Sequence, residues 1–217
     1  MHEADQAELH AQSVLEVALG IELDDIELGQ DYVLDTSKDM LSRCEKLVAS
    51  EPSAQVVVAL VAGLRNSYHL KPVHRLLVEM TNQVVKSLHA AQDGRTSLLC
   101  AVDVLGQTFK YGVQPADLDL VLQMCSDPIL TYEGDIEDVR GYWFDSLGKI
   151  RSDRSGELCR TIIDADLGIW RDLRLGSAIQ ALRRVWNETD PARVSRVAEE
   201  HPDSYIRKVA KRSLAQR

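Results

Sequence analysis

Aromatic and arginine side chains in the second half of the sequence are the residues best suited to binding chemistry. Three aromatic residues occupy positions 142–144, and a tryptophan with two arginines occupies positions 170–174. Consecutive residues on a helix point around its circumference, so one or two of the three adjacent rings should be partly exposed. Exposed rings beside guanidinium groups are typical of protein interfaces and of nucleobase stacking. The predicted partner-binding residues are Arg140, Tyr142, Trp143, Trp170, Arg171 and Arg174.

The motifs that mark common enzyme active sites are missing from the sequence. It contains no Gly-x-Gly-x-x-Gly, no Walker loop, no His-Glu-x-x-His and no Gly-x-Ser-x-Gly. His69 and His74 flank Pro72, but their separation does not place them on one face of a helix. We therefore predict no catalytic residues and interpret the histidines as surface or turn residues.

The cysteines and acidic residues do not form a recognisable metal site. Cys44, Cys100, Cys125 and Cys159 have no paired spacing. Three of them lie among apolar helical positions, and we expect buried free thiols. The acidic stretch at 24–31 lacks the loop pattern and terminal glutamate of an EF-hand. The sequence therefore predicts neither a metal nor a cofactor.

Composition indicates a globular protein with a substantial core. The chain has 217 residues, of which 45% are hydrophobic, more than a disordered chain carries. Its longest apolar run, residues 56–64, is far shorter than the roughly 20 residues that span a bilayer. The first residues are acidic, which is opposite to the positive start of a secretory signal. We therefore expect a cytoplasmic protein that does not bind membranes.

Charge is distributed unevenly along the chain, whose net charge is −9. Residues 1–37 contain ten acids and no lysine or arginine, whereas residues 171–217 contain eleven lysines and arginines against six acids. One explanation is that the ends of a repeat array are polar because they face water. The other is that the opposite charges steer partners or align copies head to tail. The sequence leaves both explanations open.

Proline placement indicates a chain built from helices. Five of the six prolines stand where an apolar helical pattern begins, the position at which proline costs a helix least. No Asn-Gly or Asp-Gly hairpin joins two alternating runs, so strand signals are weak. The predicted helices form successive pairs: 37–50 with 52–68, 72–91 with 94–111, 115–125 with 135–150, 155–166 with 168–187, and 191–200 with 203–216.

The last pair carries a sequence signature. Residues 202–210 read Pro-Asp-Ser-Tyr-Ile-Arg-Lys-Val-Ala and are followed by Leu214, and Val139-Arg140 with Leu147 echoes this phrase. The phrase resembles the HEAT repeat, whose second helix often carries a proline-aspartate turn, Val-Arg, and then Ala and Leu. The resemblance implies an all-α, armadillo-type right-handed superhelix of about five antiparallel helix pairs with an extra N-terminal helix. It also implies one domain over residues 1–217, in which 1–35 form the acidic helix and connecting segment.

The resemblance implies two classes of function. HEAT-like arrays commonly serve as non-enzymatic scaffolds or adaptors that bind a protein partner on the concave face. A narrower expectation is an inhibitor or immunity-type partner of a basic protein. The alternative is a DNA-binding protein of the alkylpurine DNA glycosylase type, which HEAT-like folds include. A sequence pI near 5.2 opposes phosphate binding, so nucleic acid is the less expected partner.

Overall fold

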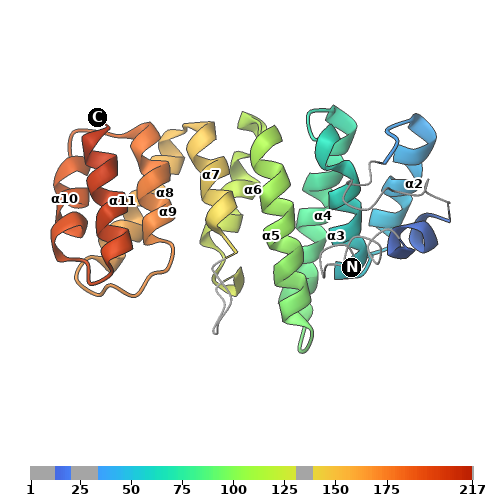
Figure 1. Cartoon of the computed structure of the whole chain (residues 1–217), viewed down its shortest axis with the longest axis horizontal. Helices are drawn as coiled ribbons and strands as arrows, with labels where there is room; N and C mark the ends of the chain where they lie inside the picture. Colours follow the sequence, from blue (N-terminus) through green and yellow to red (C-terminus); the bar gives the residue numbers. More distant parts are fainter. Residues whose placement is uncertain (1–12, 21–33, 131–138, 217) are drawn as a thin grey trace, which may run out of the picture. The chain divides into compact units, whose positions relative to one another are not determined.

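A computed structural model of the chain describes residues 13–20, 34–130 and 139–216. Helices, connecting turns and loops make up these ranges, and no strand occurs within them (Figure 1). The all-α prediction is thus confirmed for the part of the chain described. The chain divides into two compact units, Met1–Gly112 and Val113–Arg217. That both belong to one domain remains a prediction.

The N-terminal unit packs its helices in two rows. α2 packs against α4, α3 packs against α5, and α4 and α5 pack against each other. Serine side chains start two of these helices, since Ser37 and Ser53 each accept a hydrogen bond from a backbone N–H of the first turn. The elements are a helix at 13–19, α2 (Lys38–Ala49), α3 (Ala54–Leu64), η1 (Arg65–Ser67), α4 (Lys71–Ala90) and α5 (Arg95–Gly112).

The C-terminal unit repeats this two-row packing. α6 packs against α8, and α8 against α10, while α7 packs against α9, and α9 against α11. Each first helix also packs against the helix that follows it. The elements are η2 (Pro115–Asp117), α6 (Leu118–Ser126), η3 (Pro128–Leu130), α7 (Gly141–Ile150), α8 (Asp153–Asp166), α9 (Leu175–Leu182), η4 (Arg183–Val185), α10 (Asp190–Glu200) and α11 (Ser204–Ala215).

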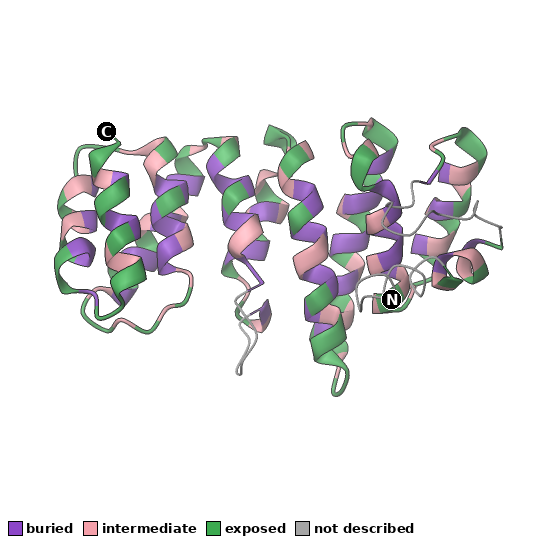
Figure 2. Cartoon of the chain, in the orientation of Figure 1, coloured by how far each residue is buried: buried purple, intermediate pink, exposed green. Residues whose placement is uncertain are grey.

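Most buried residues of each unit are apolar and form its core. Figure 2 colours the buried residues of the helices purple. In the C-terminal unit α7 and α9 approach closely at Gly148, where a Cβ would lie 3.2 Å from the Cα of Ala181. The two-row packing within each unit is what stacked helix pairs require. A right-handed superhelix running through the whole chain remains a prediction.

Most predicted helices are confirmed to within a few residues, but one is wrong over its first third. The segment predicted as a helix at 168–187 becomes helical only at Leu175. Gly168 and Trp170 have φ angles of +86° and +55°, which no right-handed helix accommodates. α7 begins at Gly141 instead of 135, and residues 131–138 lie outside the described part of the chain.

None of the helices in the described ranges is both long enough and apolar enough to span a bilayer.

Candidate functional site

The α8–α9 loop, residues 167–174, is organised by the last residue of α8. The carbonyl oxygen of Asp166 accepts hydrogen bonds from the backbone N–H groups of residues 169 and 170, at 3.0 and 3.1 Å. Its side-chain Oδ1 accepts two more, from the N–H groups of Arg171 at 2.8 Å and Asp172 at 3.1 Å. Because one residue holds four consecutive amides, the loop has a defined conformation.

A second aspartate fixes the end of the loop. Oδ1 of Asp172 accepts from the backbone N–H of Arg174 at 2.9 Å, and the guanidinium group of Arg174 donates to both carboxylate oxygens. The same guanidinium group donates through Nη1 to the carbonyl oxygen of Cys125 at 3.3 Å, near the end of α6. Arg174 therefore ties the loop to α6.

The pKa of the Asp172 carboxyl group reflects this arginine. Burial raises the pKa, but the hydrogen bonds from Arg174 and the charges of Arg174 and Arg140 lower it by more, so it lies below its ordinary value. Asp172 therefore remains charged wherever the protein is near neutral pH.

The loop alternates between outward and inward side chains. Ile169 and Leu173 are 59% and 64% exposed, and Arg171 between them is also exposed. Trp170 points the other way, and its ring packs edge-on against the His201 ring with centroids 5.1 Å apart. The loop therefore presents an arginine flanked by two large apolar side chains.

A pocket of about 410 Å³ lies beside the loop. Three arginines and two aspartates line it, and Arg171 is the exposed arginine among them. No ion pair to Arg171 occurs within the described residues, and Oδ2 of Asp166 has no hydrogen-bond partner among them. The lining residues are Ser126, Pro128, Arg140, Ala165, Asp166, Ile169, Arg171, Asp172, Leu173 and Arg174.

The structure brings three of the six predicted binding residues to this pocket, namely Arg140, Arg171 and Arg174. Trp170 belongs to the same loop but not to the pocket lining, and it lies in a loop rather than in the predicted helix. Tyr142 does not line the pocket either.

Two of the six predicted binding residues are buried. Trp143 has no exposed area and Arg140 is 1% exposed, so we correct the expectation that either side chain is available for surface contact. Tyr142 is half-buried while Trp143 and Phe144 are buried, which confirms that one of the three adjacent rings is partly exposed.

Sequence reasoning missed four residues of the site: Asp166, Ile169, Asp172 and Leu173. Ile169, Asp172 and Leu173 were missed because residues 168–187 were interpreted as one helix, in which Ile169 and Leu173 take core positions four residues apart. Asp166 was interpreted as the last residue of the helix predicted at 155–166. Gly168 directly after the helical pattern of α8 was the available signal, since glycine there commonly ends a helix.

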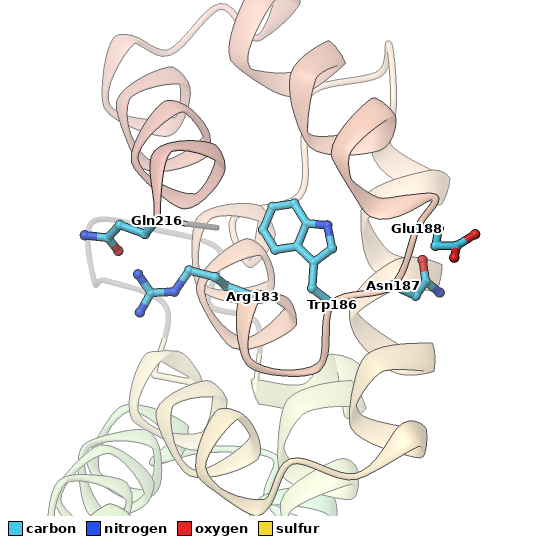
Figure 3. A pocket seen from close by; sticks show the side chains of 5 residues that line it. All are labelled: Arg183, Trp186, Asn187, Glu188 and Gln216. Atoms are coloured by element: carbon cyan, nitrogen blue, oxygen red, sulfur yellow. The ribbon is translucent and has the colours of Figure 1, made fainter.

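A second pocket, of about 420 Å³, lies at the end of α11 (Figure 3). The Trp186 indole occupies its centre, with Arg183 and Gln216 to one side and Asn187 and Glu188 to the other. Its indole Nε1 is buried and has no acceptor among the described residues. One base, Arg183, and one acid, Glu188, line this pocket.

The burial of three of the four cysteines indicates a structural role for them. Cys44, Cys125 and Cys159 are buried, whereas Cys100 is exposed, which corrects the expectation of four buried thiols. Burial raises the pKa of Cys44 to about 11 and that of Cys159 to about 12. Across the described ranges no group of three His, Cys, Asp or Glu residues is placed to hold a metal ion.

Comparisons with protein-family models, with curated proteins and with solved structures find no match for this chain. The HEAT-like resemblance of residues 202–214 therefore remains a prediction.

Proposed function

We propose that the protein is a non-enzymatic protein-interaction module built from HEAT-like helix pairs, and that the α8–α9 loop contacts its partner. One observation supports this proposal above the others. Five large hydrophobic side chains are highly exposed in the described part of the chain, and two of them, Ile169 and Leu173, flank Arg171 in this loop. Apolar side chains around an arginine are typical of the centre of a protein interface.

The conformation of the loop adds to this argument. Binding costs conformational entropy when a surface must become ordered, at about 0.5–1.5 kcal/mol for each immobilised side chain. The four hydrogen bonds to Asp166 and the contact of Trp170 with His201 already hold the backbone that carries Arg171. A partner therefore meets a surface whose backbone is already ordered.

The charge of the loop bears on the chemistry of the partner. The exposed Arg171, which forms no ion pair among the described residues, favours a segment that carries carboxylates. The narrower expectation of an inhibitor or immunity-type partner of a basic protein rests on the net charge of −9, and this pocket does not favour it. The glycosylase-type alternative gains no support either, because the acidic chain opposes phosphate binding.

Affinity capture with matched variants tests the proposal. The double variant Arg171→Glu/Leu173→Asp should fail to retain a protein that the unmodified chain captures from its native extract. Arg212→Glu is the control, since Arg212 is exposed in the same unit and undergoes the same charge reversal as Arg171 in the double variant. Equal retention by all three chains would refute the loop as the binding surface.

A further inference from the structure

The α8–α9 loop sets a specific chemical requirement on its occupant. A carboxylate can pair with the exposed Arg171, and apolar side chains can cover the exposed Ile169 and Leu173 on either side. The occupant is therefore a chain segment in which acids and large apolar residues alternate closely. A purely acidic tail or a purely apolar helix meets only half of the requirement.

This protein contains such a segment in its own sequence. Residues 21–31 read Ile-Glu-Leu-Asp-Asp-Ile-Glu-Leu-Gly-Gln-Asp, with five acids and four large apolar residues in eleven positions. They belong to the stretch 1–37, which has ten acids and no lysine or arginine, whereas residues 171–217 carry an excess of five positive charges. The two regions are complementary in charge and in apolar content.

The residues that flank this segment are fixed to the N-terminal unit. Before it, the carbonyl oxygen of Leu19 accepts from Nη1 of Arg43 in α2 at 3.4 Å. After it, the backbone N–H of Leu34 donates to the carbonyl oxygen of Gly63 in α3 at 2.9 Å, and Leu34 is 1% exposed. The described residues on both sides of residues 21–31 thus belong to the folded N-terminal unit.

We propose that residues 21–31 of one copy bind the α8–α9 loop of a second copy, so that the protein associates head to tail. This inference rests on the proposed function, because it uses the same loop. A carboxylate of the segment pairs with Arg171, and its isoleucine and leucine side chains cover Ile169 and Leu173. The interface joins two different surfaces, so each added copy leaves one segment and one loop available for another.

Two variants test the proposal by complementation in sedimentation experiments. Arg171→Glu removes the receiving side, and the triple variant Asp24→Asn/Asp25→Asn/Glu27→Gln removes the donating side. We expect the unmodified chain to form assemblies that grow with concentration, and each variant alone to associate at least about tenfold more weakly, a loss of about 1.4 kcal/mol. An equimolar mixture of the two variants should form a two-chain complex and stop there, because only one complete junction remains.

Salt and a matched substitution complete the test. At about 1 M salt, where the Debye length is about 3 Å, the two-chain complex should dissociate. Arg212→Glu should leave the association unchanged. A one-chain mass for the unmodified protein at every concentration, or a mixture that forms no two-chain complex, would overturn head-to-tail association. Loss of captured partner in the loop variant would still support the proposed function in that case, so the two failures are distinguishable.

Discussion

Asp166 is the residue on which the conformation of the α8–α9 loop depends most. Its Oδ1 accepts two backbone N–H groups, and the residue is only 4% exposed. Asp166→Ala should lower the free energy of unfolding by about 2–4 kcal/mol, because two amides lose a charged acceptor. Asp166→Asn keeps a carbonyl oxygen at that position and should cost less. Urea unfolding of the three chains measures both effects, and equal stability of the alanine variant would contradict the assigned role.

The cysteines provide a residue-scale test of burial. In the native protein at pH 8, an alkylating reagent should modify Cys100 rapidly and leave Cys44, Cys125 and Cys159 protected, because the thiolate is the reactive form and burial opposes it. Mass spectrometry should find one modified thiol in the native chain and four in urea. Rapid modification of Cys159 in the native chain would contradict the buried position.

Stability should also fall at alkaline pH. The raised pKa values of Cys44 and Cys159 mean that the native state holds these protons more tightly than the unfolded state, whose thiol pKa is about 8.5. The protonated thiols contribute fully to the free energy of unfolding below about pH 8.5. This contribution is lost as the pH rises toward the native pKa, about 11 for Cys44 and about 12 for Cys159. Replacing both cysteines with alanine should flatten this part of a plot of unfolding free energy against pH.

At the scale of the helices, a buried ion-pair network joins α8 to α10. Asp190 has no exposed surface, and its carboxylate accepts from Arg160 at 2.9 and 3.0 Å and from Arg193 at 2.9 Å. Asp190→Ala should lower the free energy of unfolding by about 3–5 kcal/mol, because two arginines lose a buried partner. Glu200→Ala is the control, since its pair with Arg196 is half exposed and such pairs contribute about 0–1 kcal/mol. Similar losses in both variants would contradict the network.

The helices were predictable from sequence where caps and periodicity agreed. Asp190-Pro191 marks the start of α10, and Asp203 caps α11 by accepting from the backbone N–H of Tyr205 at 2.7 Å. The α8–α9 loop was not predictable in this way, because Ile169 and Leu173 have helical spacing. The hydrogen bonds of Asp166 to four amides and the contact of Trp170 with His201 hold these residues out of a helix. Trp170, Arg171 and Arg174 were thus predicted as binding residues from their side-chain types, although the helix predicted for them is a loop.

At the scale of the whole molecule, the oppositely charged ends of the chain have different roles in the proposed association. Residues 171–217, which carry an excess of five positive charges, include Arg171 of the α8–α9 loop, and the acidic residues 21–31 are the complementary segment. Partner binding and self-association both use this loop, so a tight-binding partner should compete with head-to-tail assembly. Sedimentation of the protein with a saturating amount of captured partner should then show one chain per complex. Assemblies that persist with the partner bound would contradict a shared surface.

The most direct test of the central claim is hydroxyl-radical footprinting of the protein with and without its captured partner. Leu173, Ile169 and Tyr205 are 64%, 59% and 62% exposed in the C-terminal unit, so all three side chains should be modified when the protein is alone and monomeric. If the α8–α9 loop is the interface, the partner should protect Ile169 and Leu173 and leave Tyr205 modified as before. Unchanged modification of Ile169 and Leu173 in the complex would contradict the account.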